Sequence, residues 1–331
     1  MLNLFGGLRL DRIAPAAVAL TAFFGAIQAH AETITVTHWG AQFYGAPYEV
    51  ARVKGFFKNR GLDITGFLTS AGGGTSVRNT LAGDLPYGEV ALPAAILAID
   101  SGQPLKIING GAESIADIVW VTQPDSPFNS MKDLAGRKVA FTSPGSVTNM
   151  LVLMCLKSAG MSNSDLKLLP AGDTGAMYAA VINRAVDAGM MGEPLWSAKT
   201  NTVKPVFWAK DCVGPKMTQT VGITTTDFAT TGGDKIRAII AARREGVEYI
   251  HAHPDETADI MAKAYNGDVQ LYRQVIRHFI EMGFWGDGRL NHTAMDRMAE
   301  GMVLVGTLKA PPDWSKLTDA SFLPPDLQPA R

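Results

Sequence analysis

Apolar and polar residues follow two rhythms over residues 33–111. Stretches in which alternate residues are apolar, such as 32–39, predict strands. Stretches with apolar residues three and four positions apart predict helices. One of these covers 48–61, counts Val53 among its apolar positions and has Gly61 as its predicted C-cap. Strands and helices alternate here with short connections, which predicts parallel α/β units.

The same pattern restarts at residue 137. A strand over 137–141, a hydroxyl-rich turn and a helix reaching Gly160 open this second block. Extended segments at 116–136 and 219–228 flank the block. Two extended crossings on either side of an α/β insert are what two lobes joined by two strands require.

From Asp234 onward the pattern is purely helical. Pro254 is expected in the first turn of one helix and Asn291 as the N-cap of another. The tail over 310–331 contains five prolines and is predicted to lie extended along the surface. The four predicted helices cover 234–253, 254–265, 269–284 and 292–308.

Composition supports a folded protein with no affinity for nucleic acid. The chain has 331 residues, of which 47% are hydrophobic and 18% charged, so it can form a sizeable core. Its 30 Lys and Arg residues against 31 Asp and Glu give a net charge of −1. Because no basic bias exists, we expect no nucleic-acid partner.

Residues 1–31 have the features of an export signal. Arg9 and Arg12 precede an uncharged, largely apolar run over 13–27, and Ala29-His30-Ala31 forms a small-x-small cleavage site. An N-terminal membrane anchor is the alternative, but the run is shorter than the roughly 20 residues that a spanning helix needs. We therefore expect a Sec-type signal peptide, cleaved after Ala31, and a periplasmic mature chain.

Two cysteines, Cys155 and Cys212, would then meet an oxidising compartment. A disulfide between them is one outcome. However, Cys155 lies on an apolar helix face and Cys212 in a turn-like stretch, and cysteine often serves as a small buried residue. Two separately buried thiols are the preferred expectation.

Candidate binding residues follow from the sheet architecture. Ligands of open α/β sheets bind beyond the carboxyl ends of the strands, where the chain turns into helices. The turn over 142–148 suits an anion, because free N–H groups at a helix start lie at the positive end of the helix dipole. The turns together combine aromatic side chains, hydroxyls, acids and backbone donors, which suits one small polar or anionic molecule. The candidate residues are Trp39, Phe43, Tyr44, Gly73, Gly74, Thr75, Pro93, Glu113, Ser143, Ser146, Val147, Thr148 and Glu193.

Several of these candidates also have a purely structural interpretation. Ser146 would be an ordinary N-cap, Glu193 an acid that serves a helix start, and the three aromatic residues parts of the core or its rim. The glycines at 72–74 fit neither GxGxxG nor GxxxxGK[ST], so a nucleotide loop is not expected. Histidine and cysteine spacing fits no zinc site and no GxSxG elbow occurs. We therefore expect no catalytic residue, no metal and no cofactor.

Two segments resemble a known family. They are ARVKGFFKNRGLDI (51–64) and MKDLAGRKVAF (131–141), the latter followed by a Gly-Ser turn. They resemble the periplasmic substrate-binding proteins of ABC importers, in the nitrate/sulfonate/taurine group that also includes thiamine-precursor binders. The resemblance extends over about 33–325.

The resemblance implies a two-lobed α/β fold of the type II-like binding-protein class, with two crossover strands and a ligand cleft between the lobes. Lobe 1 would comprise 33–120 plus 224–331, and lobe 2 would comprise 121–223. In that family the ligand is held by turns that correspond here to Trp39 to Tyr44, Gly73 to Thr75 and Ser143 to Thr148, with an acid or its neighbour near Glu193.

The function that the resemblance implies is non-enzymatic. A monomeric, extracytoplasmic solute-binding component would capture a sulfonate, carboxylate, nitrate or pyrimidine-like molecule by lobe closure and deliver it to the permease subunits of an ABC transporter. The stretch 87–95 departs from the family pattern, with Glu89 in an unusual place, and leaves the ligand class open. A pyrimidine-precursor synthase-like enzyme and an exported ligand sensor are the alternatives. The export signal and the two isolated cysteines speak against the enzyme.

Overall fold

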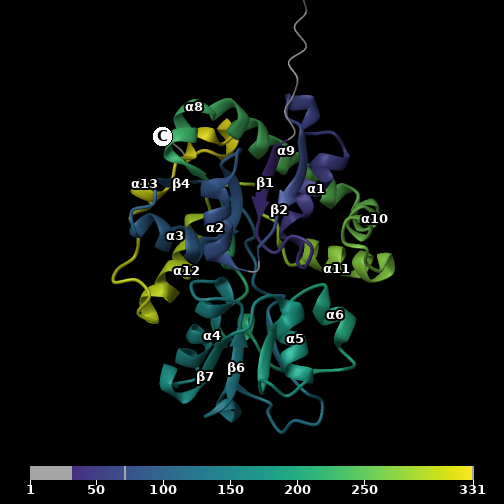
Figure 1. Ribbon diagram of the computed structural model, residues 1–331, viewed down its shortest axis with the longest axis vertical. Coiled ribbons are helices and arrows are strands. Elements are labelled where there is room, and N and C mark those ends of the chain that lie inside the picture. The colour runs from purple at the N-terminus through teal and green to yellow at the C-terminus, as the bar shows by residue number, and fades with distance from the viewer. Residues whose placement is uncertain (1–31, 71, 330–331) are drawn as a thin grey trace, which may run out of the picture.

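The computed structural model of the chain describes residues 32–70 and 72–329 (Figure 1). Two five-stranded sheets, each flanked by helices, form two lobes that lie one above the other in Figure 1. We call the lobe that holds the first strand lobe 1 and the other lobe 2. The predicted signal peptide, residues 1–31, lies outside the described residues.

The sheet of lobe 1 has the strand order β2-β1-β3-β10-β4. β1 pairs in parallel with β2 and β3, whereas β10 runs antiparallel to β3 and β4. Its strands are β1 (Glu32–Val36), β2 (Ile64–Leu68), β3 (Tyr87–Ala91), β4 (Leu105–Gly110) and β10 (Thr220–Thr225).

The sheet of lobe 2 has the order β7-β6-β8-β5-β9. β6 pairs in parallel with β7 and β8, whereas β5 runs antiparallel to β8 and β9. Its strands are β5 (Val119–Thr122), β6 (Lys138–Phe141), β7 (Lys167–Pro170), β8 (Ala188–Met191) and β9 (Lys204–Trp208).

The antiparallel strand of each sheet is the one that arrives from the opposite lobe. The parallel units predicted for the two α/β blocks are confirmed, and β5 and β10, which lie in the predicted extended crossings, run antiparallel because they enter a sheet directly from the other lobe and not through a helix on its face. The crossing segments, 111–118 and 214–219, lie side by side, and Ile115 N donates to Pro215 O at 2.9 Å. The predicted limits of lobe 2, 121–223, fall inside β5 and β10.

Helices flank both sheets, and the four helices predicted after Asp234 are confirmed. Pro254 lies in the first turn of α10, and the Asn291 side chain caps α12 by accepting from Ala294 N. The helices of lobe 1 are α1 (Ala46–Val53), α2 (Gly73–Ala82), α3 (Leu92–Asp100), α8 (Thr226–Thr231), α9 (Gly233–Ala252), α10 (Pro254–Tyr265), α11 (Val269–Glu281), α12 (His292–Leu304) and α13 (Trp314–Leu317). Those of lobe 2 are α4 (Val147–Ser158), α5 (Thr174–Ile182), α6 (Leu195–Lys199) and α7 (Ala209–Val213).

The first helix is shorter than predicted. α1 ends at Val53, whose side chain is exposed and not part of the core. Gly55 follows with a φ of 79°, in the left-handed region that interrupts a right-handed helix. Gly61, with a φ of 75°, is the C-cap of a separate 3₁₀ helix, Lys58–Arg60.

The tail over 310–331 was predicted to lie extended along the surface, and this prediction is wrong. Beyond α13 it forms two 3₁₀ helices, Ala320–Phe322 and Pro325–Leu327. The Asp319 carboxylate caps the first of these by accepting from Ser321 N. Burial of Phe322, Leu323 and Leu327 gives the tail its own apolar anchor, and Pro325 fits the first turn of a helix.

Cys155 and Cys212 form a disulfide, with Cα atoms 5.2 Å apart. The preferred expectation of two separate thiols is therefore wrong. α4 and α7 pack against each other, so two side chains that are 57 positions apart in sequence meet. The bond fixes the helix that follows the 142–148 turn to the end of lobe 2 next to the second crossing.

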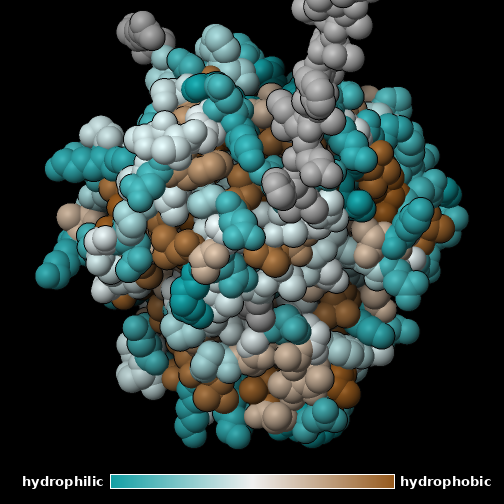
Figure 2. Space-filling model, turned by 45° about the horizontal axis from the view of Figure 1, so that its top comes forward, coloured by the Kyte–Doolittle hydropathy of each residue, from teal (hydrophilic) through white to brown (hydrophobic). Residues whose placement is uncertain are grey.

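The surface carries small apolar patches interrupted by polar side chains, as Figure 2 shows for one face. Among residues 32–70 and 72–329, no helix combines the length and apolar character needed to cross a membrane.

Candidate functional site

A small cavity lies between the two lobes. Its volume is about 10 Å³, room for roughly one water molecule, so the lobes are closed on each other. Lobe 1 contributes the turn after β1, the start of α2, the end of β3 and the start of β10, and lobe 2 contributes the turn after β6 and one residue of β8. The cavity is lined by Thr37, His38, Gln42, Tyr44, Gly73, Ala91, Thr142, Ser146, Val147, Thr148, Met190 and Thr220.

Three polar atoms of the turn after β1 have no partner. Thr37 Oγ1, His38 Nδ1 and Gln42 Nε2 are buried and make no hydrogen bond within the described part of the chain. A buried polar group that lacks a hydrogen bond costs about 1–3 kcal/mol. His38 also has a φ of 54°, which is uncommon for a residue other than glycine and is typical of functional sites. These features make the turn a candidate place for a ligand to supply the missing partners.

The His38 ring is neutral at physiological pH. Burial lowers its pKa to about 4, although the Asp173 carboxylate opposes the shift. A neutral imidazole offers one donor and one acceptor, and it brings no positive charge to the cavity.

Tyr44 connects the cavity to the crossing segments. Its hydroxyl donates to Gln219 Oε1 at 2.6 Å, and the Gln219 amide donates in turn to Ser114 O. Ser114 and Gln219 belong to the two different crossings. Tyr44 therefore lines the cavity and bonds to a crossing segment through its hydroxyl.

The wall in lobe 2 is the start of α4. Ser146 is the N-cap, since its Oγ accepts from Asn149 N at 3.1 Å. Thr148 Oγ1 accepts from Thr142 N at 3.0 Å and lies 3.1 Å from Ser146 Oγ. The structural interpretation of Ser146 as an N-cap is confirmed. Because the first N–H groups of a helix lack partners within the helix, the same turn presents donors to the cavity.

The facing wall in lobe 1 is the start of α2, where backbone approaches backbone. A Cβ on Gly73 would lie 2.7 Å from Ala94 Cβ and 3.0 Å from Ala91 Cβ. A Cβ on Gly72 would lie 2.2 Å from the Oγ of Ser143, which belongs to lobe 2 and is itself buried without a partner. Gly72 therefore allows the close approach of the two lobes, Gly73 allows α2 to pack closely on α3 and β3 within lobe 1, and the N-termini of α2 and α4 both border the cavity.

Two of the predicted aromatic residues lie in the core of lobe 1, outside the cavity lining. Phe43 is fully buried, with its ring centroid 4.8 Å from that of Tyr272. Trp39 is half-buried and packs against Phe67 at 4.4 Å and Tyr265 at 4.9 Å. The positions of these two rings fit the core interpretation that was open from the sequence.

The predicted acids also lie outside the lining. Glu113 Oε2 accepts from Asn291 Nδ2 at 3.0 Å, and burial raises the pKa of this carboxyl. Glu193 precedes α6 and accepts from Ser197 Oγ at 2.7 Å and Ser197 N at 3.2 Å, and burial raises its pKa too. Beside it, burial and then the charge of Glu193 raise the pKa of Asp117 to about 7.

The other predicted residues divide between lining and rim. Tyr44, Gly73, Ser146, Val147 and Thr148 come together at the cavity. Gly74 lies next to it in a neighbouring groove, Thr75 is exposed, and Pro93 is buried in the first turn of α3.

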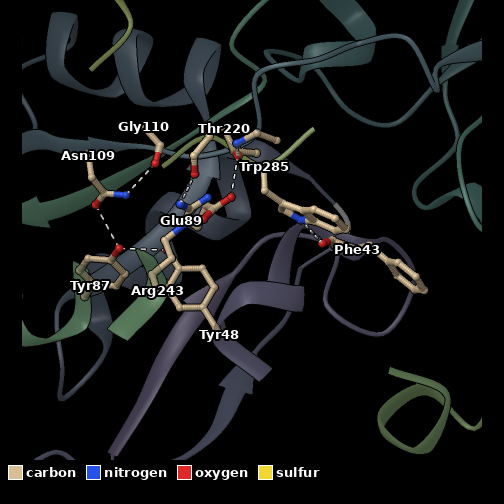
Figure 3. A network of polar contacts seen from close by, with 11 residues as sticks. Phe43, Tyr48, Tyr87, Glu89, Asn109, Gly110, Thr220, Arg243 and Trp285 are labelled. Carbon is tan, nitrogen blue, oxygen red and sulfur yellow. Dashed lines mark hydrogen bonds and ion pairs between the residues drawn. The ribbon is translucent and has the colours of Figure 1, made fainter. Parts of the chain in front are cut away.

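A buried ion pair supports the cavity from behind (Figure 3). Arg243 Nε of α9 donates to Glu89 Oε2 of β3 at 2.9 Å, and both side chains are excluded from solvent. Thr220, which lines the cavity, donates to Glu89 Oε1 at 2.7 Å. Burial alone would lower the pKa of Arg243, but the Glu89 carboxylate raises it above its ordinary value. Glu89 thus links the helical layer to the cavity wall.

The sequence contained weak signals for the residues that were missed. Thr37 and His38 extend the strand pattern and are predicted as strand residues, although the turn begins there. An acid at Glu89 within an apolar strand demands a buried cation, but 154 positions separate it from Arg243. Met190 and Thr220 lie within strands and carry no local signal.

Comparison with known proteins identifies relatives of this architecture. Residues 42–257 match the family model described as NMT1/THI5 like. No curated protein sequence matches the chain.

Solved structures share the fold. The periplasmic aliphatic sulphonate binding protein SsuA from Escherichia coli is 17% identical, with a TM-score of 0.68 over 87% of this chain and 97% of that one. The alkanesulfonate-binding protein SsuA from Xanthomonas axonopodis pv. citri, bound to MOPS, is 15% identical, with a TM-score of 0.70 over 86% and 94%. The periplasmic nitrate-binding protein NrtA from Synechocystis PCC 6803 is 16% identical, with a TM-score of 0.62 over 74% and 69%. These neighbours have the two-lobed fold of periplasmic binding proteins, as the sequence predicted.

Proposed function

The chain belongs to the NMT1/THI5-like family, and from this membership we propose that it is the extracytoplasmic solute-binding component of an ABC importer. It captures a small polar or anionic molecule between its lobes and delivers it to the permease subunits in the membrane. The predicted export signal, and the periplasmic sulphonate- and nitrate-binding proteins among its structural neighbours, support a periplasmic location.

The observation that carries the proposal is the set of unpartnered polar atoms in the interlobe cavity. Thr37 Oγ1, His38 Nδ1 and Gln42 Nε2 belong to residues of lobe 1 that line the cavity together with the start of α4 of lobe 2. A ligand that satisfies groups of both lobes binds the closed arrangement better than the open one, so it shifts the population to the closed state.

The charge of the cavity favours a monoanion. The lining contains no Lys, Arg, Asp or Glu, and its one histidine is neutral. Each helix N-terminus is equivalent to roughly half a positive charge, so the starts of α2 and α4 together balance about one negative charge. A sulfonate, carboxylate or nitrate group has that charge.

Glu193 does not oppose such a ligand directly. Glu193 is turned toward Ser197 by two hydrogen bonds, and it lies outside the lining. We propose Tyr44, Gly73, Ser146, Val147 and Thr148 as ligand contacts, together with the three residues that carry unpartnered atoms.

An enzymatic function has less support. The chain contains two cysteines, and both are engaged in the disulfide, so neither offers a thiolate nucleophile. We propose a monomeric binding protein that uses no cofactor.

Calorimetric titration of the purified protein with methanesulfonate, acetate and nitrate tests the proposal, with methylammonium as the cationic control. We expect one-to-one binding of at least one anion and none of the cation. Ser146→Trp should abolish anion binding, because the indole fills the cavity. Ser162→Trp is the matched control, since Ser162 is also an N-cap of lobe 2 but is exposed.

Circular dichroism shows whether both variants fold. Absence of binding by every anion, or equal anion affinity in Ser146→Trp and wild type, would overturn the proposal.

A further inference from the structure

Two ionisable side chains of opposite type are buried where the lobes meet. His38, in the turn after β1 of lobe 1, lines the interlobe cavity. Asp117 lies in the crossing segment 111–118, two positions before β5, and is 4% exposed. A side chain buried away from water is most stable when it is neutral. An imidazole becomes neutral by losing a proton, whereas a carboxylate becomes neutral by gaining one.

Both lobes and both crossings contribute to the surroundings of the Asp117 carboxylate. A Cβ on Gly192, just after β8 of lobe 2, would lie 3.2 Å from Asp117 Oδ2 and 3.3 Å from Gln42 Nε2 of lobe 1. The carboxylate and this amide therefore flank the same point. The second crossing contributes Gln219, whose Nε2 donates to Asp117 Oδ1 at 3.5 Å. We expect opening to withdraw Gln42 with lobe 1 and to admit water to Asp117.

The His38 ring is buried by the same closed arrangement. Its Nδ1 is buried without a partner in the described part of the chain, and the start of α4 in lobe 2 completes the cavity around it. The Tyr44 ring centroid lies 6.3 Å from that of His38, and the charge of the exposed Asp173 of lobe 2 acts on the imidazole. We expect opening to remove the lobe 2 wall and to return the imidazole to water.

The other titratable groups around Asp117 should keep their protonation when the lobes move. Glu193 accepts from Ser197 within lobe 2, a contact that opening does not break. The charge of His278, an exposed residue of α11, acts on Glu193. Burial raises the pKa of Tyr44 well above its ordinary value, so its hydroxyl keeps its proton near neutral pH.

We infer that Asp117 and His38 compensate each other when the lobes close: Asp117 takes up a proton from water, His38 gives one up to water, and capture of an anion is therefore nearly independent of pH. The inference rests on the proposed function, and it adds a proton balance to closure on the ligand.

Either group alone would make closure depend on pH. Burial raises the pKa of Asp117 from 3.8 to about 7, so its support for closure is full below pH about 4 and is lost as pH rises through about 7. Burial lowers the pKa of His38 from 6.5 to about 4, so its support is full above pH about 6.5 and is lost as pH falls through about 4. Between pH 5 and pH 8 these pKa values change the closing equilibrium about ninetyfold through Asp117 and about thirtyfold in the opposite direction through His38. The net change is about threefold.

Calorimetric titration with nitrate and methanesulfonate at pH 5, 6, 7 and 8 tests the inference, because both anions keep their charge over this range. We expect the Kd of wild type to change by no more than about threefold. In Asp117→Asn only His38 titrates, so the Kd should rise at least about tenfold as pH falls from 8 to 5. In His38→Asn only Asp117 titrates, so the Kd should rise at least about tenfold as pH rises from 5 to 8. Asparagine is among the residues that best tolerate the φ of 54° at position 38.

Three controls separate compensation from insensitivity to pH. The double variant Asp117→Asn/His38→Asn should again bind nearly independently of pH. Titrations in buffers of different ionisation enthalpy count the protons exchanged at pH 6, and we expect about one taken up by His38→Asn, most of one released by Asp117→Asn and close to none in wild type. Glu113→Gln should keep the wild-type profile. Burial also raises the pKa of this carboxyl in the same crossing, but its partner Asn291 belongs to lobe 1.

The outcomes separate the inference from the proposed function. If anions bind but the two single variants are as insensitive to pH as wild type, the proton balance is refuted and the anion site stands. A change of more than about tenfold in the wild-type Kd would overturn the compensation in the same way. If no anion binds at any pH, the proposed function falls and the inference falls with it.

Discussion

Replacing either member of the Glu89–Arg243 ion pair should destabilise the protein strongly. The side chains of Arg243 and Glu89 are 1% and 0% exposed, and Arg243 Nε lies 2.9 Å from Glu89 Oε2. Arg243 also donates to Gly286 O at 2.8 Å, and its guanidinium carbon lies 5.7 Å from the centroid of the Tyr48 ring. Either single substitution leaves a charge that is buried and unpaired.

The magnitude follows from that uncompensated charge. Removal of one partner of a buried pair costs about 3–5 kcal/mol, whereas replacement of both by apolar residues of similar volume is often neutral. We expect Glu89→Met and Arg243→Met each to lower the free energy of unfolding by about 3–5 kcal/mol. The double variant should cost at least roughly 2 kcal/mol less than the sum of the singles, because neither charge remains.

Urea denaturation followed by circular dichroism measures the free energy of unfolding of wild type, Glu89→Met, Arg243→Met and the double variant, which together form a double-mutant cycle. Arg244→Met is the matched control on the same helix. Arg244 pairs with Glu248 and Asp326 near the surface, with side-chain exposures of 29%, 63% and 58%. Its loss should cost about 1 kcal/mol or less. The reasoning is refuted if each single variant loses no more free energy of unfolding than Arg244→Met does. It is also refuted if the loss in the double variant equals the sum of the two single losses to within about 0.5 kcal/mol.

Three further predictions concern pH, the disulfide and closure. The pKa of Asp117 is raised to about 7 by burial and by Glu193, so its contribution to stability is full below pH about 4 and is lost as pH rises through about 7. Asp117→Asn should therefore match wild type near pH 4 and be the more stable protein at pH 8 by a few kcal/mol, and parallel stability curves from urea titrations would contradict this. The Cys155–Cys212 bond closes a loop of 57 residues, so Cys155→Ala/Cys212→Ala should lose about 4 kcal/mol in the chain-entropy account, and dithiothreitol should lower the melting temperature of wild type but not of this variant. Gly301 of α12 lies against α4 of the other lobe, and a Cβ on Gly301 would lie 2.4 Å from Met154 Sδ. Gly301→Leu should therefore hold the lobes apart and raise the radius of gyration measured by X-ray scattering. Adding Met154→Ala should reverse the change.

Local patterns were sufficient for most elements of the fold. Alternation near Ile34 and helical spacing after Pro254 report burial within one element, so β1 and α10 appear where they were expected. Two predictions failed, the end of the first helix and the extended tail, because one local sequence feature outweighed another. Gly55 interrupts α1 before the apolar pattern ends, and the apolar residues around Phe322 fold a tail whose prolines predicted extension.

The site was harder to predict, because the residue types that bind ligands also build cores. Strand ends point to Trp39, Phe43 and Tyr44 alike, yet only Tyr44 lines the cavity. What separates the three is packing against α10 and α11, which lie more than 200 positions later in the sequence. The same holds for Glu89, whose buried partner Arg243 no local pattern can select.

The unpartnered atoms of the cavity also give a reason for closure to depend on ligand. In the closed arrangement Thr37, His38 and Gln42 each bury a polar atom without a partner, and at about 1–3 kcal/mol for each group the closed state is penalised by roughly 3–9 kcal/mol. We expect separation of the lobes to expose these groups to water and so to remove the penalty. A shift from 1:99 to 99:1 between two states requires about 5.5 kcal/mol of differential binding, which lies within this range. A ligand that supplies three hydrogen-bond partners can therefore provide the whole driving force for closure, and no further contact between the lobes is required to make the change switch-like.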